Sequence, residues 1–276
     1  MKRCGIVAPA GRADSEKAAV KVWEWMRERE IDVFCESFLH DRLPGTGLLR
    51  RGVTADAFVA LGGDGTILRC VPYAAGKDIP ILGINLGTKG FLAAAEADGL
   101  ENALEALLSG NAPVDRRRLI HINGDDSLLA LNDVAILRGG RQRLMSVRVS
   151  VDGEEVGVYH ADGLLAASPT GSTGYALSAG GPIIMPGTAC LEIIPICAHS
   201  LQSRPIVVPD SSNIRFQMTD DPEMEGMLQL DGKTIDLMHA GSSVDISFSE
   251  LTLSLIRMDR TGYFHIVNRK LTEWSM

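Results

Sequence analysis

The chain has 276 residues, of which 45% are hydrophobic and 22% are charged, a composition typical of soluble globular proteins with one large domain or two. Its net charge of −8 opposes non-specific attraction to nucleic acid and to anionic membrane surfaces. Neither class of partner is therefore expected.

The cysteines and the N-terminal segment predict the compartment. Five cysteines are scattered without CxxC spacing, which is typical of reduced thiols and argues against structural zinc. The N-terminal segment lacks the apolar core of a signal peptide, and no apolar run approaches the ~20 residues that span a bilayer. We therefore expect a cytoplasmic protein with no fixed metal site.

Apolar runs and amphipathic segments alternate in the first part of the chain, which predicts strands that alternate with helices. The predicted strands are 3–9, 31–37, 55–61 and 79–85, and the predicted helices are 15–30, 66–75 and 99–110. This alternation implies βαβ units and a parallel sheet. Residues 1–112 are therefore predicted to form a Rossmann-like α/β nucleotide-binding domain.

The pattern changes after residue 110. Apolar residues alternate with period two in 144–153, and the pairs Asp152-Gly153 and Asp231-Gly232 lie between such runs. Asp-Gly pairs are strong hairpin signals because both turn positions tolerate a positive φ. These signals predict antiparallel β-structure.

Residues 113–276 are accordingly predicted to form a mostly antiparallel β-sandwich domain, with one helix near residues 173–180. The fold class is thus α/β plus β. Residues 262–276 either complete the second domain or fold back on the first.

The segment AFVALGGDGTILR, residues 57–69, ends a predicted strand with three glycines around Asp64. Ligands collect beyond the carboxyl ends of parallel strands, and glycines leave backbone N–H groups open to phosphate oxygens. A P-loop is excluded because GxxxxGK[ST] is absent.

The aspartate in this turn needs its own explanation, because an ionised carboxylate repels phosphates. Asp64 could accept a proton from an attacking hydroxyl or help to hold the magnesium of a nucleoside triphosphate. Alternatively, it could cap the helix that begins near Thr66. The turn alone leaves catalysis and capping open.

Two further clusters are candidates for ligand contacts. GINLGTKGFL, residues 83–92, is predicted to shape another wall of a cleft, where Lys89 either reaches a phosphate or is solvated. Residues 159–186 are rich in Gly, Ser and Thr, and Tyr175 among them could stack on a base. The alternative for this segment is a loop with a capped helix.

The segment LNDVAILRGGRQR places Asn132 beside Asp133, a pair suited to ribose hydroxyls or to a base edge. Its basic residues Arg138, Arg141 and Arg143 either bind a diphosphate or form a solvated hairpin tip.

Together, LGGDGTILR, LNDVAILRG, DGLLAASPTGSTGYALSAGGPIIMP and ICAHSLQSRPIVVPD, in this order, resemble the NAD kinase family over most of the chain. The glycine- and serine-rich segment is the specific part of this resemblance, because lipid kinases share a turn like GGDGT. The resemblance implies a nucleotide-binding α/β domain joined to a β-sandwich.

The resemblance also implies site residues, with Asp64 as the catalytic base. The residues that it implies in NAD binding are Asp64, Gly65, Arg69, Asn132, Asp133, Arg143, His160, Asp162, Thr173, Gly174, Tyr175, Ala176, Leu177 and Ser178. Three positions depart from the family pattern, namely Lys89, Gly174 and Lys233.

The implied activity is transfer of the γ-phosphoryl group of ATP to the 2′-hydroxyl of the adenosine ribose of NAD, which gives NADP. Mg²⁺ or another divalent cation would accompany ATP, polyphosphate is an alternative donor, and a homodimer or homotetramer is expected.

Two alternatives carry less support. A lipid kinase of the diacylglycerol type would need a membrane-binding basic amphipathic helix, which is not evident. A non-catalytic dinucleotide sensor would have no need of Asp64.

Overall fold

The computed structural model describes residues 1–87, 90–140, 144–200, 202–221, 223–258 and 263–274. Its contacts divide the chain into two compact units. Met1–Arg116 and Thr252–Met276 form the first unit, and Arg117–Leu251 form the second. Strands β7 (Val114–Ile122) and β18 (Ser243–Ile256) contribute residues to both units.

The first unit contains a parallel sheet with the strand order β5-β4-β1-β2-β3. The other edge of β5 pairs in parallel with the end of β18, at Ser254 and Leu255. The elements of this unit are β1 (Arg3–Val7), α1 (Ala13–Arg27), β2 (Asp32–Cys35), α2 (Ser37–His40), β3 (Gly47–Leu48), β4 (Ala57–Leu61), α3 (Asp64–Leu68), α4 (Val71–Ala74), β5 (Pro80–Asn85), β6 (Ala95–Glu96), η1 (Ala97–Gly99), α5 (Leu100–Ser109) and α7 (Tyr263–Trp274).

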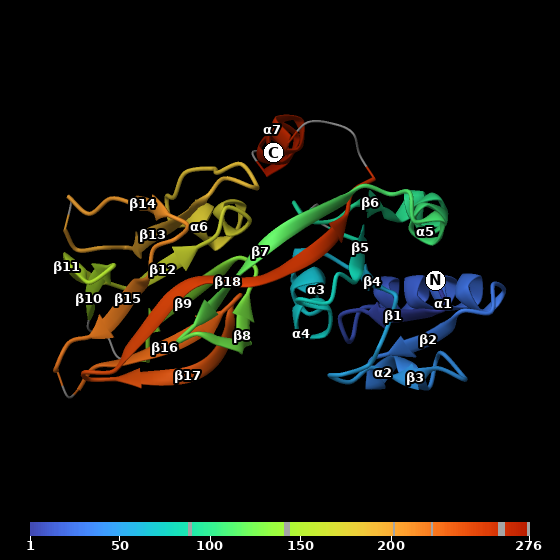
Figure 1. Ribbon diagram of the computed structural model, residues 1–276, viewed down its shortest axis with the longest axis horizontal. Coiled ribbons are helices and arrows are strands. Elements are labelled where there is room, and N and C mark those ends of the chain that lie inside the picture. The colour runs from blue at the N-terminus through green and yellow to red at the C-terminus, as the bar shows by residue number, and fades with distance from the viewer. Residues whose placement is uncertain (88–89, 141–143, 201, 222, 259–262, 275–276) are drawn as a thin grey trace. The chain divides into compact units, whose positions relative to one another are not determined.

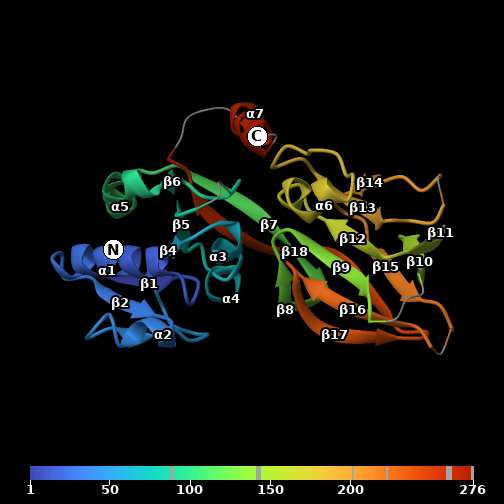
Figure 2. The same ribbon diagram turned by 180° about the vertical axis from the view of Figure 1, so that it is seen from behind.

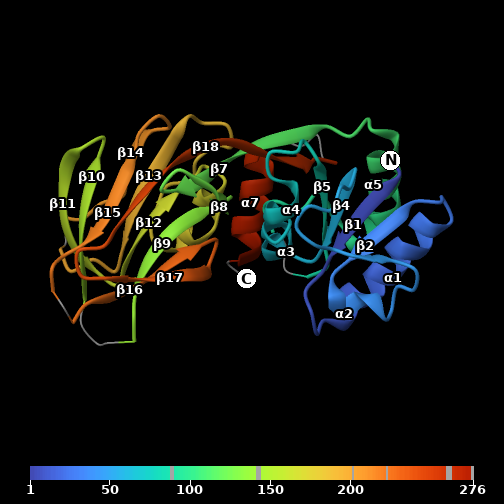
Figure 3. The ribbon, with the colours of Figure 1, turned by 60° about the horizontal axis from the view of Figure 1, so that its bottom comes forward.

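Helices cover both faces of this sheet because its strands are apolar on both sides. Helices α1 and α5 lie on one side and α3 and α4 on the other (Figures 1 and 3). Val59 and Leu61 pack with the buried side chains of α1 and α5, whereas the ring of Phe58 lies beside Tyr73 of α4. The parallel sheet and its helices confirm the predicted α/β class.

The helix predicted over 66–75 is instead two short helices. Helix α3 begins two residues earlier, at Asp64, and α4 starts anew at Val71 with Pro72 in its first turn. Proline has no N–H to continue the preceding helical hydrogen bonds, and it is well tolerated at the start of a helix. The apolar pattern alone could not reveal this break.

The second unit is formed mainly from antiparallel strands. One sheet has the strand order β14-β13-β12-β9-β16-β17, and the strands β11-β10-β15-β18 and the pair β7-β8 lie opposite it. The elements are β8 (Asp125–Ala130), β9 (Asp133–Arg138), β10 (Met145–Val151), β11 (Glu154–Ala161), β12 (Gly163–Ala167), η2 (Gly171–Thr173), α6 (Tyr175–Ser178), β13 (Cys190–Ile196), β14 (Ile206–Pro209), β15 (Ile214–Met218), β16 (Glu225–Leu230) and β17 (Lys233–His239).

The core of the second unit lies between its two sheets, where fully buried side chains such as Ile136, Val149 and Phe216 meet. The outer face of the six-stranded sheet carries a smaller apolar cluster under α6, beside β12 and β13 (Figure 2). This arrangement confirms the predicted antiparallel sandwich with one helical segment.

Both predicted hairpin turns are confirmed. Asp152 and Gly153 have φ of 53° and 86° and join β10 to β11, and Asp231 and Gly232 have φ of 48° and 76° and join β16 to β17. Two consecutive positive φ angles give the turn a twist that matches the flanking strands.

Cys4, Cys35, Cys70 and Cys190 are buried and Cys197 is exposed, and all five thiols are free. No helix in the described part of the chain combines the length and apolarity needed to cross a membrane.

Replacing Phe58 with alanine should destabilise the first unit. Its fully buried ring packs so closely on β1 that a Cβ at Gly5 would overlap it. Loss of this ring is expected to cost about 3 to 5 kcal/mol. The measurement is denaturant unfolding followed by tryptophan fluorescence, since Trp23 and Trp25 lie on α1.

The matched control is Val114→Ala, because Val114 is 48% exposed. It should change stability by less than about 0.5 kcal/mol. Equal unfolding midpoints for the two variants would contradict the packing described for Phe58.

Candidate functional site

Asp64 is oriented by hydrogen bonds from the second glycine cluster. Its Oδ2 accepts the backbone N–H of Phe91 at 2.7 Å, and its Oδ1 accepts that of Leu92 at 3.0 Å. The N-cap of α3 is Gly63, and no side-chain cap hydrogen bond is formed there. The capping interpretation is therefore wrong, because Asp64 is the first helical residue and its carboxylate bonds to another segment.

Glycine is required where these two segments meet. A Cβ at Gly90 would overlap the carboxylate of Asp64, and a Cβ at Gly62 would overlap the hydroxyl of Thr66. The backbone of residues 90–92 can therefore reach Asp64 only because position 90 has no side chain. Lys89 lies outside the described residues.

Arg69 follows α3 and is tied to the end of β1. Its guanidinium donates to the carbonyl of Ala8 at 2.9 Å and forms an ion pair with Glu36. Glu36 in turn accepts the N–H of Ala8 at 3.0 Å. Gly65 is exposed in the first turn of α3.

In the second unit, the backbone at Asn132 is held by a carboxylate that is distant in sequence. Asp231 accepts the N–H groups of Leu131, Asn132 and Asp133 at 2.8, 2.7 and 3.2 Å. A Cβ at Gly171 would overlap the carbonyl oxygen of Asn132. The amide and carboxyl of the Asn-Asp pair are thus presented from a fixed main chain.

Sequence reasoning assigned Asp231 only to a hairpin turn. Its second role depends on the pairing of β16 with β9, which local sequence does not reveal.

Burial and charge alter the acidity of this pair. Burial, and then the charge of Asp231, raises the pKa of Asp133 to about 7. The Oδ1 atom of Asn132 is buried without a hydrogen-bond partner among the described residues. Because the pKa is raised only in the folded state, protonated Asp133 contributes to the free energy of unfolding at low pH. This contribution is lost as the pH rises from the ordinary pKa of an aspartate towards about 7.

The segment after β12 uses many of its own hydroxyls. Ser168 donates to the carbonyl of Leu131 at 2.6 Å, Ser172 to that of Pro169 at 2.8 Å, and Thr173 to that of Thr170 at 3.3 Å. These contacts fix the loop, so fewer hydroxyls are left for a ligand than the sequence predicts.

The rest of this segment differs in accessibility. Tyr175 and Ser178 are exposed, Gly174 and Leu177 are half-buried, and Ala176 is buried. Tyr175, with 41% of its surface exposed, is free to stack on a planar group.

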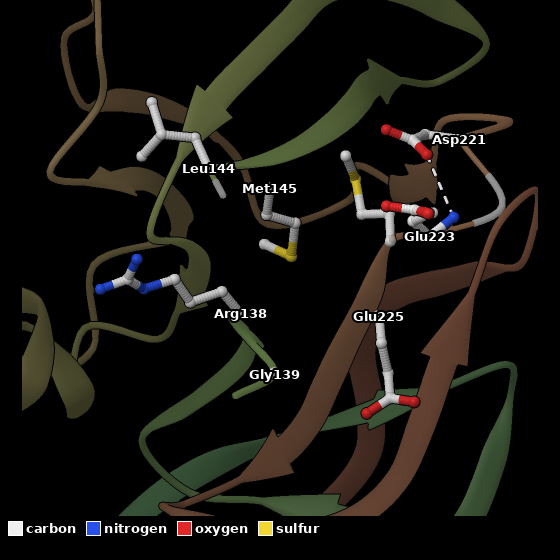
Figure 4. A pocket seen from close by; sticks show the side chains of 8 residues that line it. Arg138, Gly139, Leu144, Met145, Asp221, Glu223 and Glu225 are labelled. Atoms are coloured by element: carbon white, nitrogen blue, oxygen red, sulfur yellow. Dashed lines mark hydrogen bonds between the residues drawn. The ribbon is translucent and has the colours of Figure 1, made fainter. Parts of the chain in front are cut away.

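His160 and Asp162 lie at the end of β11 and just after it. The Nδ1 atom of His160 is 2.7 Å from the hydroxyl of Ser146, and Asp162 pairs with Arg138 at 3.2 Å. Arg138 also lines a hollow together with Met145 (Figure 4). Arg143 lies outside the described residues.

Three carboxylates line the same hollow, namely Asp221, Glu223 and Glu225. The backbone N–H of Glu223 donates to Asp221 at 3.1 Å (Figure 4). The guanidinium of Arg138 points away from these carboxylates (Figure 4), so they do not decide between a diphosphate site and a solvated hairpin tip.

Glu192 was not anticipated, because it lies within an apolar run that predicts only a buried strand. It is fully buried in β13, and burial followed by the charge of Asp133 raises its pKa to about 8. A charged residue inside such a run is the one signal that could have found it.

The predicted site residues are thus distributed between the two units. Asp64, Gly65 and Arg69 belong to the first, and the other described ones belong to the second. Within the second unit, Asn132 and the 168–174 segment are in direct contact.

Comparisons with known proteins cover both parts of the chain. Residues 45–112 match the ATP-NAD kinase N-terminal domain, and residues 131–258 match the ATP-NAD kinase C-terminal domain. The chain is 34% identical to an NAD kinase of Desulforamulus reducens, and the match covers 100% of this chain and 99% of the relative. It is also 34% identical to an NAD kinase of Methanothermobacter thermautotrophicus, and the match covers 99% of this chain and 97% of the relative.

Two solved structures are similar in fold. Yeast NADH kinase complexed with NADH has a TM-score of 0.88 at 24% identity, covering 100% of this chain and 89% of that one. An NAD kinase from Archaeoglobus fulgidus in complex with ATP has a TM-score of 0.78 at 26% identity, covering 98% of each.

Asp231→Asn should lower the pKa of Asp133 below about 7, because it removes the neighbouring negative charge. The variant also loses one acceptor for the backbone N–H groups, at an expected cost of about 1 to 3 kcal/mol. Carboxyl carbon chemical shifts followed against pH check the first effect, and thermal unfolding checks the second. An unchanged titration of Asp133 would show that the two carboxyls do not interact.

Proposed function

The chain belongs to the NAD kinase family, and on that premise we propose that Asp64 accepts the proton of the attacking 2′-hydroxyl. As an NAD kinase, the protein transfers the γ-phosphoryl group of ATP to the 2′-hydroxyl of the adenosine ribose of NAD. The proposal concerns which residues perform this transfer. The full-length similarity to NAD kinases sets aside the lipid kinase and the non-catalytic sensor.

The fixed orientation of the Asp64 carboxylate is the observation that carries the proposal. Each oxygen accepts one backbone N–H, from Phe91 or Leu92. An ionised carboxylate has about four lone-pair positions, so acceptor capacity remains for a substrate hydroxyl. Phosphoryl transfer depends mainly on positioning and charge neutralisation, and these amides position the base before substrate binds.

Recognition of the dinucleotide is assigned to the second unit. Asn132 presents a buried amide oxygen that has no hydrogen-bond partner within the described ranges of the chain, which suits a donor such as an exocyclic amine. Asp133 suits ribose hydroxyls, and exposed Tyr175 suits stacking on a base. Thr173 to Ser178, with Gly174, Ala176 and Leu177 between them, would line the same ligand, and His160 and Asp162 would contact its nicotinamide part.

A divalent cation is part of the proposal, because Mg²⁺ neutralises phosphate charge in transfers from ATP. The ion would arrive with ATP rather than occupy a fixed protein site, since the described residues contain no group of three or more His, Cys, Asp or Glu side chains that could hold a metal. The ligands named for two similar proteins, NADH and ATP, support a dinucleotide and ATP as substrates. A cytoplasmic homo-oligomer completes the proposal.

Asp64→Asn should fold and bind NAD but lose turnover by a factor of ~10²–10⁴, the usual contribution of a general base. NADP formation from NAD and magnesium-ATP is measured with a reporter dehydrogenase that is strict for NADP. Calorimetry with NAD alone measures binding.

The control for this variant is Asp98→Asn, which removes an exposed carboxylate from η1 of the same unit. It should keep wild-type turnover. Near-wild-type activity of Asp64→Asn would exclude Asp64 as the base.

Gly90→Ala should also lower kcat, although it leaves every polar side chain in place. The new methyl group would overlap the carboxylate of Asp64 and turn it away from its backbone donors. The control is Gly99→Ala in the same unit, which should keep the wild-type kcat, because Gly99 has a φ of -89° and a Cβ there would meet only the Cβ of Ala95, at 3.7 Å. If Gly90→Ala left kcat unchanged, the orientation of Asp64 would not matter for turnover.

A further inference from the structure

Two carboxyl side chains share one row of the six-stranded sheet. Ala167 of β12 pairs with Asp133 of β9 on one side and with Glu192 of β13 on the other. Directly paired residues project from the same face of a sheet, and adjacent strands lie roughly 4.8 Å apart. Only the methyl group of Ala167 therefore stands between Asp133 and Glu192.

Glu192 is enclosed without being satisfied. It is fully buried, and neither carboxyl oxygen has a hydrogen-bond partner in the described part of the chain. Its apolar neighbours include Ile194 on the same face of the sheet and Ala176 on α6. A Cβ at Gly181 would come within 3.1 Å of Oε2, so the glycine leaves room for the carboxyl.

Packing does not explain this residue. A buried polar group without a partner destabilises a fold, and a leucine would suit the apolar face better. The carboxyl lies beneath the segment from Tyr175 to Gly181, to which the proposed function assigns part of the dinucleotide site. The carboxyl of Glu192 is therefore expected to serve ligand binding rather than the stability of the fold.

The titratable groups that face Glu192 are few. Among the described residues they are Asp133 on β9, whose charge raises the pKa of Glu192, and Cys190 on its own strand, whose pKa the charge of Glu192 raises. Asp231 in turn acts on Asp133. The paired positions on β12 and β14 are Ala167 and Val207, which do not titrate.

The order of ionisation follows from burial and charge. The pKa of Asp133 is raised to about 7 and that of Glu192 to about 8. Glu192 is fully buried and neither of its oxygens has a partner among the described residues, so burial and the charge of Asp133 together help it to retain its proton. As the pH rises above about 7, Asp133 becomes mostly ionised and supplies the negative charge of the pair.

We propose that Glu192 is a positioning residue for NAD that acts through Asp133, by remaining neutral so that Asp133 alone carries the charge that accepts ribose hydroxyls. This inference rests on the proposed role of Asp133. Bound NAD excludes water from Asp133 and opposes a second charge beside it. Above the pH at which free Glu192 ionises, binding therefore requires uptake of a proton.

The test is the pH dependence of NAD binding to the intact protein without ATP, measured by calorimetry from pH 6.5 to 9.5. The wild type should lose up to about tenfold in affinity per pH unit above about 8, and it should take up as much as one proton, counted in buffers of different ionisation enthalpy. Glu192→Gln, which mimics the neutral acid, should bind equally well at pH 7 but lose both effects.

Two controls separate this role from a structural one. Glu192→Leu removes the carboxyl and fills the apolar face, so it should show the same flat profile as Glu192→Gln and unfold at a higher temperature at pH 9. Glu154→Gln removes an exposed carboxylate from the same unit and should keep the wild-type profile. A wild-type profile in Glu192→Gln, or no alkaline loss in the wild type, would overturn the proposal.

A third variant distinguishes this inference from the proposed function. Asp133→Asn should bind NAD more weakly at pH 7 and should not show the alkaline loss, because position 133 then carries no charge for ionised Glu192 to oppose. Unweakened binding at pH 7 would instead reject Asp133 as a ribose contact, whatever the profile of Glu192→Gln.

Discussion

The hydrogen bonds from Phe91 and Leu92 to Asp64 are the constraint on which the first unit's chemistry depends. They join two glycine clusters that follow neighbouring parallel strands, β4 and β5. Parallel strands bring their carboxyl ends to one edge, and the missing side chain at Gly90 lets the backbone approach. The glycines of two short segments thus allow a contact between residues that are distant in sequence, and this contact orients the carboxylate of Asp64.

The fold was largely predictable because it depends on local signals. Alternating apolar runs gave the parallel sheet, and the Asp-Gly pairs gave two hairpins whose positive φ angles are observed at Asp152 and Asp231. The break between α3 and α4 was missed because apolar spacing outweighed Pro72 in the prediction. Predictions from residue propensity and apolar pattern are least accurate where a single residue interrupts a longer periodic segment.

The candidate site was predictable only in part. Asp64 and Asn132 stand out in sequence, but the partners that orient them come from strand pairing and loop packing. Asp231 accepts hydrogen bonds from backbone N–H groups that lie about a hundred residues away in the sequence. Glu192 is a single charged residue in an apolar run, and sequence alone assigns it no role. Both are carboxyls whose importance depends on burial, which only the folded chain defines.

The division of the chain also affects how the protein is made. The first unit contains both ends of the sequence. Residues Pro80 and Ile81 of β5 pair with Ser254 and Leu255 of β18, whereas Ile84 and Asn85 of β5 pair with β6. During synthesis the whole second unit emerges before Ser254 and Leu255 do, so the start of β5 lacks its partner strand in the interval. Unpaired edges invite association with other chains, and pairings between distant segments form slowly. The start of β5 is therefore the part of the first unit's sheet that is paired last during synthesis.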